Sequence, residues 1–327
     1  MLRWGLLATG VIARKFADTV NAMSAQEQTV LVACAARDAD RAAAFAAEFG
    51  IPKSYGSYEQ LVNDPEVDIV YISSPNHLHA DHTRLCLQHG KHVLCEKPFV
   101  FSAAEAAELY ALAAEKGLFL MEALWTYHLP LIKTAQQLVA DGALGTVQYL
   151  RADYGFVATG ARRTRKFESG LGGGALLDIG IYNLAFAHQM LGGYLGEFTG
   201  QPRLNEFGTD WFSQITGQYP GGVPASLTAC IGLVMPTEGV VYGTEGRLVL
   251  HNYQQAQQMT LYKNDGTVQE FSMPFDHTGF EYQVRECMRC IAQGLTASTV
   301  YPPAASIAHM EELERIRAVW GMKFACE

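Results

Sequence analysis

The sequence contains few basic residues for its length. Its 327 residues include 24 Lys and Arg against 33 Asp and Glu, which gives a formal net charge of −9. Binding to nucleic acid or to an anionic membrane depends on clustered Lys and Arg, so this balance argues against both partners. Charged residues make up 17% of the chain and hydrophobic residues 49%, a composition typical of globular proteins with buried cores.

Long hydrophobic runs and a secretion signal are also missing. The apolar run Trp4–Val11 is short, contains two glycines, and has no small-residue cleavage site before Arg14, so we expect no signal peptide. No apolar stretch is long enough to span a bilayer. The seven cysteines are scattered, and the single C-x-x-C, at Cys287 and Cys290, has no second pair. We interpret the cysteines as buried thiols rather than metal ligands, and we expect a reducing cytoplasm and no metal.

The first part of the chain alternates between predicted strands and helices. Apolar strand-like runs over 3–9, 30–34, 68–72, 93–95 and 118–121 are separated by helical patterns. This alternation of strands and helices predicts an α/β domain with a doubly wound parallel sheet, the Rossmann arrangement. At roughly 150 residues per domain the length predicts two domains, which we place at 1–122 and 123–327.

The first predicted strand leads into a glycine turn and then a helix, the context that a dinucleotide-binding fingerprint requires. The pattern G-x-G-x-x-G/A is imperfect here, since it reads Ala8-Thr9-Gly10-Val11-Ile12-Ala13. Gly10 and Ala13 keep the close backbone approach and the tight contact between helix and strand. Ala8 replaces the first glycine, and we expect a φ there that alanine tolerates. An ordinary turn of a parallel sheet would give the same short match.

The end of the second strand bears on the choice between NAD and NADP. An acidic residue there takes the ribose hydroxyls of NAD, whereas an arginine accommodates the 2′-phosphate of NADP. Arg37 comes first in this chain, and Asp38 is placed to cap the next helix, over 40–49. The sequence therefore favours NADP over NAD, although Arg37 could also be a solvated loop residue.

Two later strand ends carry further candidates. Ser73-Ser74-Pro75-Asn76 follows the strand at 68–72 and could line the nicotinamide side of a pocket, although Asn76 could equally cap a helix. Lys97 lies in Glu96-Lys97-Pro98 at the carboxyl end of a strand, where open α/β sheets bind their ligands. The Pro98 that follows stiffens the turn. Taken alone, Lys97 could be an ordinary surface lysine.

The second part of the chain is rich in strands from 196 to 273, with an alternation around Ala225 and Leu227 typical of an antiparallel sheet. Before it, the glycine run 172–174 opens a helix predicted over 175–191, and we expect this run to let the helix approach a ligand. Asp178 and Tyr182 are four residues apart on this helix, so they share a face and form a candidate catalytic pair. A basic loop at 162–166 could cover a site or be a solvated surface loop.

Together these segments resemble the glucose–fructose oxidoreductase/inositol dehydrogenase family (Gfo/Idh/MocA). The resemblance is carried by the segments 71–79, 90–98 and 172–182 and by the turn 243–246. Residues 3–5, 36–38 and 121–126 are most similar to the branch of dimeric dihydrodiol dehydrogenases and NADP-dependent D-xylose dehydrogenases. Tyr127 and His128 stand where that branch usually has an arginine, which leaves the substrate open.

The resemblance implies a Rossmann domain followed by an α+β domain with an open-faced, largely antiparallel sheet that often forms the subunit interface, so a homodimer is expected. It implies an NAD(P)-dependent oxidoreductase that transfers a hydride between the cofactor and a hydroxyl of a sugar, polyol or trans-dihydrodiol. The catalytic residues are expected to be Lys97, Asp178 and Tyr182. The residues expected to bind the cofactor, with NADP favoured, are Ala8, Thr9, Gly10, Val11, Ile12, Arg37, Ser73, Ser74, Pro75, Asn76, His79, Glu96, Lys97 and Trp125.

The proton transfer can be assigned as a hypothesis. A phenol with its ordinary pKa near 10 is a poor base at neutral pH, and a nearby lysine cation favours the phenolate. Tyr182 is therefore the candidate acid/base, assisted by Lys97, and Asp178 would orient a substrate hydroxyl or the lysine. The alternative is a regulatory protein of the same fold that binds the dinucleotide without catalysis. Such a protein need not keep all three residues.

Overall fold

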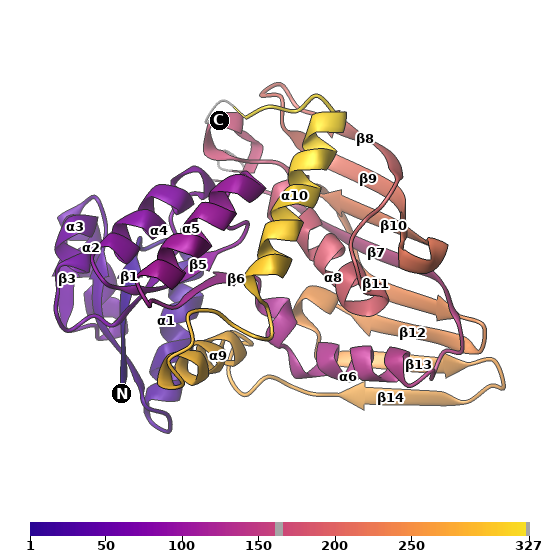
Figure 1. Ribbon diagram of the computed structural model, residues 1–327, viewed down its shortest axis with the longest axis horizontal. Helices are drawn as coiled ribbons and strands as arrows, with labels where there is room; N and C mark the ends of the chain where they lie inside the picture. The colour runs from indigo at the N-terminus through magenta and orange to yellow at the C-terminus, as the bar shows by residue number, and fades with distance from the viewer. Residues whose placement is uncertain (161–165, 325–327) are drawn as a thin grey trace. The chain divides into compact units, whose positions relative to one another are not determined.

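The computed structural model describes residues 1–160 and 166–324 of the chain (Figure 1). The chain forms two compact units, of which the first contains Met1–Trp125 and Asp276–Ile307 and the second contains Thr126–Phe275 and Ala308–Glu327. The single boundary expected after residue 122 differs from this division, because 276–307 returns to the first unit. No helix in the described ranges is long and apolar enough to cross a membrane.

The first unit is built on a six-stranded sheet in the order β3-β2-β1-β4-β5-β6, and every neighbouring pair is parallel. The chain order reverses between β1 and β4, which is the point where open α/β sheets bind ligands. The strands are β1 (Leu2–Leu7), β2 (Thr29–Ala35), β3 (Lys53–Tyr55), β4 (Ile69–Ile72), β5 (His92–Glu96) and β6 (Leu120–Ala123).

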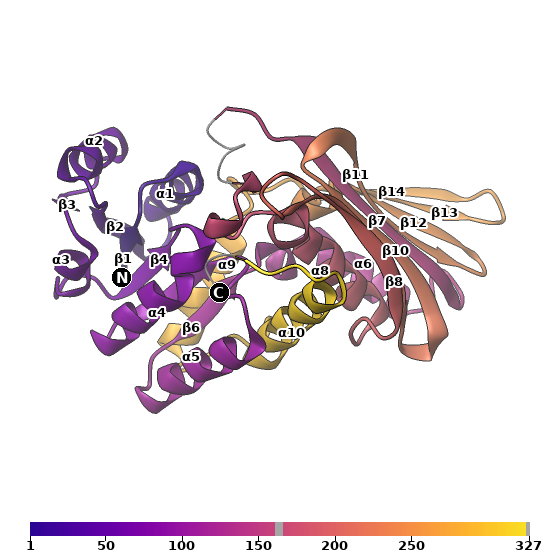
Figure 2. The ribbon, with the colours of Figure 1, turned by 90° about the horizontal axis from the view of Figure 1, so that it is seen from above.

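Helices cover both faces of this sheet. Figure 2 shows α1 and α2 on one face and α4 and α5 on the other, and α9 packs against α1. The helices are α1 (Val11–Ser24), α2 (Ala39–Phe49), α3 (Tyr58–Val62), α4 (His79–Gln88), α5 (Ala103–Glu115) and α9 (Glu281–Ala292). The core includes the fully buried rings of Phe16 and Tyr71, which stack with centroids 3.8 Å apart. The predicted doubly wound sheet is confirmed, with the short β3 as an unpredicted addition.

The second unit contains an eight-stranded sheet in the order β14-β13-β12-β11-β7-β10-β9-β8. It is antiparallel except between β7 and β10, which run parallel. The alternation around Ala225 in β10 gives no sign of this parallel pair, because it reports burial and not strand direction. The strands are β7 (Val147–Val157), β8 (Phe198–Leu204), β9 (Asp210–Tyr219), β10 (Val223–Cys230), β11 (Gly232–Gly243), β12 (Gly246–His251), β13 (Gln258–Lys263) and β14 (Val268–Ser272).

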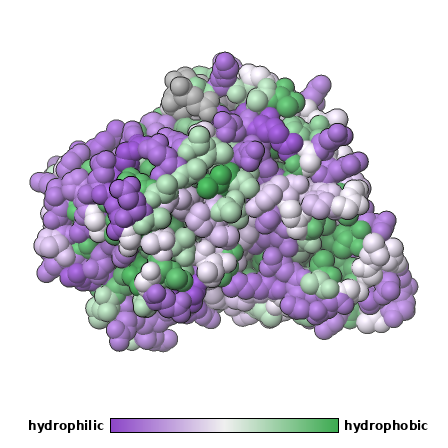
Figure 3. Space-filling model, viewed as in Figure 1, coloured by the Kyte–Doolittle hydropathy of each residue, from purple (hydrophilic) through white to green (hydrophobic). Residues whose placement is uncertain are grey.

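Helices α6 (Pro130–Ala140), α8 (Ile181–Leu191) and α10 (Pro303–Val319) lie on one face of this sheet (Figure 2). The packing is close, because a Cβ on Gly239 of β11 would overlap the ring of Phe186 in α8. On the face shown in Figure 3, hydrophilic residues cover much of the surface, with small hydrophobic patches between them. Six of the seven cysteines lie in the described ranges, and all six are free and buried, as predicted.

Candidate active site

The turn after β1 carries the predicted fingerprint, and it shows one error in the prediction. Ala8 has a φ of +78°, in the left-handed region where a Cβ is strained, so the expectation of a φ that alanine tolerates was wrong. The turn is held in place by hydrogen bonds. The Ala8 amide donates to the carbonyl of Ala35 at 3.0 Å, and the Ser73 hydroxyl donates to the carbonyl of Ala8 at 3.2 Å.

Gly10 is the N-cap of α1, with φ −79°, so its backbone does not require glycine. A Cβ at this position would meet only the carbonyl oxygen of Ser73, at 4.0 Å. No side chain caps the first turn of α1, and no acidic residue lies in it. The amide groups of this turn are therefore available to an anion approaching from outside the chain, as in phosphate sites at helix N-termini.

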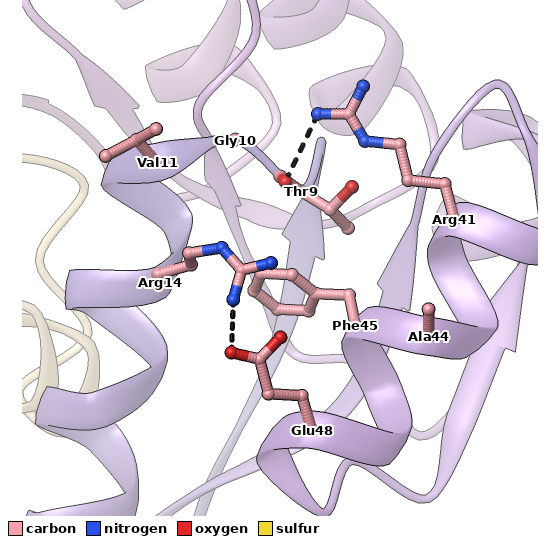
Figure 4. Close-up of a pocket in the computed structure, with 8 residues that line it drawn as sticks. All are labelled: Thr9, Gly10, Val11, Arg14, Arg41, Ala44, Phe45 and Glu48. Atoms are coloured by element: carbon pink, nitrogen blue, oxygen red, sulfur yellow. Dashed lines mark hydrogen bonds and ion pairs between the residues drawn. The ribbon is translucent and has the colours of Figure 1, made fainter.

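A hollow lies beside this turn, between α1 and α2 (Figure 4). The guanidinium of Arg41 reaches from α2 and donates to the carbonyl of Thr9 at 3.4 Å. Arg14 pairs with Glu48 and lies over the ring of Phe45, 5.5 Å from its centroid. The hollow therefore has one cation, Arg41, directed at the fingerprint itself.

Asp38 at the end of β2 caps α2, as predicted, and its carboxylate accepts from the amide of Arg41 at 3.1 Å. This leaves Arg37 and Arg41 as the cationic side chains at the end of the strand, and Arg37 is exposed. The chemistry of this corner suits an added phosphate better than a pair of ribose hydroxyls.

The segment after β4 contains the predicted serines and two histidines with structural contacts. His79 is fully buried, and its two ring nitrogens lie 2.9 Å from the carbonyl oxygens of Ser74 and Pro98. It therefore ties the end of β4 to the turn after β5. His82 is half-buried, and its Nδ1 lies 2.8 Å from the Ser74 hydroxyl. Asn76 begins a short 3₁₀ turn whose N-cap is Pro75, so Asn76 is not itself the cap.

Lys97 follows β5 and is half-buried, with a cis peptide bond to Pro98. The turn around it is held by one residue from α4 and one from β6. His79 holds the Pro98 carbonyl, and the fully buried carboxylate of Glu122 in β6 accepts from the Phe99 amide at 3.0 Å. Glu122 also accepts from the hydroxyls of Tyr301 and Ser306. Sequence reasoning missed Glu122, because a buried carboxylate that fixes backbone leaves no spacing signal.

Lys15 is a second residue that the sequence did not indicate. Its ammonium lies 4.1 Å from the ring centroids of both Trp125 and Phe280. Burial lowers the pKa of Lys15 to about 8, although the carboxylates of Glu96 and Glu281 oppose the shift. Trp125, predicted to touch the cofactor, is itself buried with this cation against its face.

In the second unit the helix with Asp178 and Tyr182 begins differently from the prediction. Its first turn, Leu176–Gly180, is a π-helix, and the α-helical part begins only at Ile181. Asp178 therefore lies in the π turn, a feature often found at functional sites, and Tyr182 lies in the first α-helical turn. Tyr182 is 8% exposed, with its ring 6.2 Å from that of Tyr154.

Asp178 forms an ion pair with Lys166, and both side chains are 20% exposed. The glycine run was expected to allow a ligand to approach, but its neighbours belong to the protein. A Cβ on Gly173 would overlap the carbonyl of Lys166, and a Cβ on Gly174 would overlap the carboxylate of Asp210. Of the basic loop at 162–166, only Lys166 lies within the described residues, so the prediction of a cover over the site is not tested.

The candidate residues thus gather within each unit. In the first unit the fingerprint, Arg37, Ser73–Asn76, Glu96 and Lys97 all follow the carboxyl ends of parallel strands, which meet at one edge of the sheet. In the second, Asp178 and Tyr182 lie in consecutive turns. No group of three or more His, Cys, Asp or Glu side chains suited to a metal occurs in the described ranges.

A parallel sheet whose order reverses beside an uncapped helix N-terminus defines the dinucleotide-binding class of Rossmann domains. Comparison with known families agrees. Residues 2–124 match the oxidoreductase family with an NAD-binding Rossmann fold, and residues 132–249 match the GFO/IDH/MocA C-terminal domain. The chain belongs to the Gfo/Idh/MocA family and is an NAD(P)-binding oxidoreductase, which confirms the predicted family, fold class and enzyme class.

Individual relatives are similar over their full length. The trans-1,2-dihydrobenzene-1,2-diol dehydrogenase of Mus musculus is 35% identical over 332 residues, covering 99% of this chain and 98% of that protein. The Homo sapiens enzyme of the same name is 36% identical, with the same coverage. A 3-ketoreductase from Actinomadura kijaniata, solved with NADP and TDP-benzene, superposes with a TM-score of 0.87 at 26% identity over 97% of both chains. An aldose-aldose oxidoreductase from Caulobacter crescentus, solved with glycerol, gives 0.87 at 26% identity over 98% and 97%.

Proposed function

We propose that the protein oxidises a hydroxyl group of a trans-dihydrodiol, sugar or polyol with NADP, or reduces the corresponding carbonyl. The observation that carries the proposal is the edge of the six-stranded sheet. There the uncapped start of α1 and Lys97 follow β1 and β5, the two strands that flank β4. The full-length relatives named as dihydrodiol dehydrogenases and the aldose oxidoreductase support the substrate class.

The choice of NADP rests on the end of β2. Asp38 already accepts from the backbone of α2, and Arg37 and Arg41 supply two cationic groups at this corner. A 2′-phosphate carries the charge that pairs with guanidinium groups, whereas ribose hydroxyls need an acceptor such as a carboxylate. The 3-ketoreductase relative was solved with NADP.

We assign the catalytic roles to Lys97, Asp178 and Tyr182. NADP supplies the hydride acceptor at C4 of its nicotinamide. As the C–H bond breaks and the C=O bond forms, the phenolate of Tyr182 takes the hydroxyl proton. Lys97 is assigned to donate a hydrogen bond to the substrate oxygen. Asp178, paired with Lys166, orients a substrate hydroxyl.

The remaining residues of the first unit hold the cofactor and the Lys97 turn. The turns after β1 and β4, with Glu96 and Trp125, are assigned to the cofactor, and His79 acts through the two carbonyls that it holds. The second unit is assigned to substrate binding and to assembly.

We propose a homodimer through the sheet face opposite α6, α8 and α10. That face carries the stacked rings of Tyr149 and Tyr242, 5.6 Å apart, and the ion pair of Arg151 with Glu238 at 2.5 Å. Light scattering of the purified protein tests this assignment, and a monomer at micromolar concentration would contradict it. The buried free cysteines suit a cytoplasmic location, which fractionation of the source cells would test.

The function is tested by following NADPH absorbance with a panel of trans-dihydrodiols, aldoses and polyols. We expect NADPH to form with members of one of these classes and NAD to be used less well. Tight NADP binding with no turnover on any member would contradict the proposal and favour the regulatory alternative.

A further inference from the structure

We infer that Asp210 is a positioning residue for the reaction, because its carboxylate fixes the start of the helix that carries Asp178 and Tyr182. The expected effect on turnover rests on the proposed function, whereas the contact of Asp210 with the helix start does not. Asp210 is the first residue of β9 and is fully buried. The residues proposed to react lie on a different element of the same unit, so Asp210 acts through the backbone and not on substrate.

The contact is made at the first turn of the helix. Oδ2 of Asp210 accepts from the amide of Leu176 at 2.8 Å. The residue at the helix's own N-cap, Ala175, makes no side-chain cap. Asp210 therefore acts as a capping residue supplied by a neighbouring strand.

The glycine run is shaped to admit this carboxylate. Gly174 has a φ of +117°, and a Cβ there would overlap Oδ1 of Asp210. Any side chain at position 174 would displace either Asp210 or the start of the helix. Position 174 therefore requires glycine for two reasons, its positive φ and the space that Oδ1 of Asp210 occupies.

The segment next to Lys166, the ion-pair partner of Asp178, is also bound by residues beside Asp210. Thr209, next to Asp210, donates a hydrogen bond from its hydroxyl to the carbonyl of Phe167 at 2.7 Å. The side-chain amide of Asn205 donates to the same carbonyl at 3.1 Å. Phe167 follows Lys166, whose ammonium pairs with Asp178. Thr209, in the connection from β8 to β9, thus fixes the segment that carries Lys166. Asp210, the first residue of β9, fixes the start of the helix that carries Asp178.

These contacts predict a specific effect on turnover. If the start of the helix moves, Asp178 and Tyr182 move with it, and a misplacement of about 1 Å at reacting groups can cost about 100-fold in rate. The cofactor contacts assigned to the first unit do not involve this corner, so the affinity for NADP is expected to stay the same. Asn in place of Asp210 keeps an oxygen acceptor of the same size and is expected to restore most of the rate.

The test compares Asp210→Ala, Asp210→Asn and Thr209→Val with Ile215→Val as control. Ile215 is a buried residue farther along β9, 3% exposed, and its substitution perturbs the sheet without touching the helix start. Hydrogen exchange of the amides of 174–178 is measured without substrate, together with kcat, KM and the Kd for NADP. We expect Asp210→Ala to exchange faster at these amides and to lower kcat by about 10- to 100-fold at unchanged Kd. We expect Asp210→Asn and the control to remain near wild type.

Unchanged exchange in Asp210→Ala would overturn the contact, and faster exchange with normal kcat would overturn the positioning role. Should Asp210→Ala not fold, Thr209→Val decides, since it removes the hydroxyl that donates to the Phe167 carbonyl and accepts from the Asn205 side chain, and leaves Asp210 in place. Faster exchange with lowered kcat in that variant supports the inference, and normal kcat overturns it. If the wild-type protein transfers no hydride, the proposed function fails, while the exchange data still decide whether Asp210 holds the helix.

Discussion

The carboxylate of Asp38 accepts a hydrogen bond from the backbone amide of Arg41 at 3.1 Å, and the guanidinium of the same Arg41 reaches back to the carbonyl of Thr9. One arginine thus links the helix cap at the end of β2 to the fingerprint turn. The arrangement engages the acidic residue that an NAD site would need and directs a cation towards the phosphate-binding turn. The specificity for NADP should therefore depend on this corner.

Substitution of Arg37 or Arg41 by Ala should weaken NADP binding with little effect on NAD. A charge-assisted hydrogen bond is worth about 1.5–3 kcal/mol, so each loss should raise the Kd for NADP by about 10- to 100-fold. Calorimetric titration with both cofactors measures this difference. Arg84→Ala is the matched control, since Arg84 pairs with Asp81 and Glu108 on the surface of α4 and α5. Equal losses for NAD and NADP would contradict the assignment.

Tyr182→Phe should lower kcat by orders of magnitude and leave the Kd for NADP unchanged, because it removes the proton acceptor and keeps the ring. General acid–base groups typically contribute about 100- to 10,000-fold. Steady-state kinetics with the best substrate of the panel provides the measurement. Tyr194→Phe is a suitable control, since Tyr194 stacks on His188 near the end of α8. Near-normal turnover in Tyr182→Phe would remove this residue from the mechanism.

The periodic parts of the fold were predictable from sequence. Strand and helix patterns predicted the parallel sheet, and Asp38 caps α2 as its place in the sequence indicated. What could not be predicted depends on contacts between distant segments. Glu122 and Asp210 bind backbone groups 23 and 34 residues away, respectively. No local spacing marks such residues, and a carboxylate in a strand reads simply as polar.

The candidate site likewise contains residues that local motifs indicate and residues that only contacts between distant segments bring into place. Lys97, Asp178 and Tyr182 could be proposed from the sequence because they lie in short motifs of recognisable type. Lys15 was missed because its aromatic neighbours, Trp125 and Phe280, are far away in the chain. The conformation of Ala8 was judged wrongly for a different reason. The left-handed φ follows from the turn geometry that the first glycine normally provides, and the sequence shows only which residue stands there.

Ala8→Gly should stabilise the protein, because it removes the Cβ from a residue with a φ of +78°. The strain at such a position is about 1–2 kcal/mol, offset by about 0.5–1 kcal/mol for the greater freedom of glycine in the unfolded chain. We expect a net gain of up to about 1 kcal/mol in urea denaturation. Ala13→Gly, in the buried face of α1, should destabilise instead. A loss of stability in Ala8→Gly would show that the turn does not carry this strain.

The stability of the protein should depend on pH through Asp210. Burial raises the pKa of its carboxyl from 3.8 to about 7, although hydrogen bonds from Leu176, Ser213 and Ala175 oppose the shift. The folded chain therefore holds a proton there that the unfolded chain releases above about pH 4. The contribution of this carboxyl to stability is complete below its unfolded pKa and is lost as pH rises towards 7.

Asp210→Asn removes this titration and keeps an acceptor for the Leu176 amide. The variant should gain stability relative to wild type by up to about 1.4 kcal/mol per pH unit between pH 4 and 7, and the gain should level off above that range. Urea denaturation of both proteins at a series of pH values gives the difference directly. Because both chains share every other titrating group, those groups cancel in the comparison. A difference that does not vary with pH would mean that Asp210 titrates alike in the folded and unfolded chains, and would contradict the raised pKa.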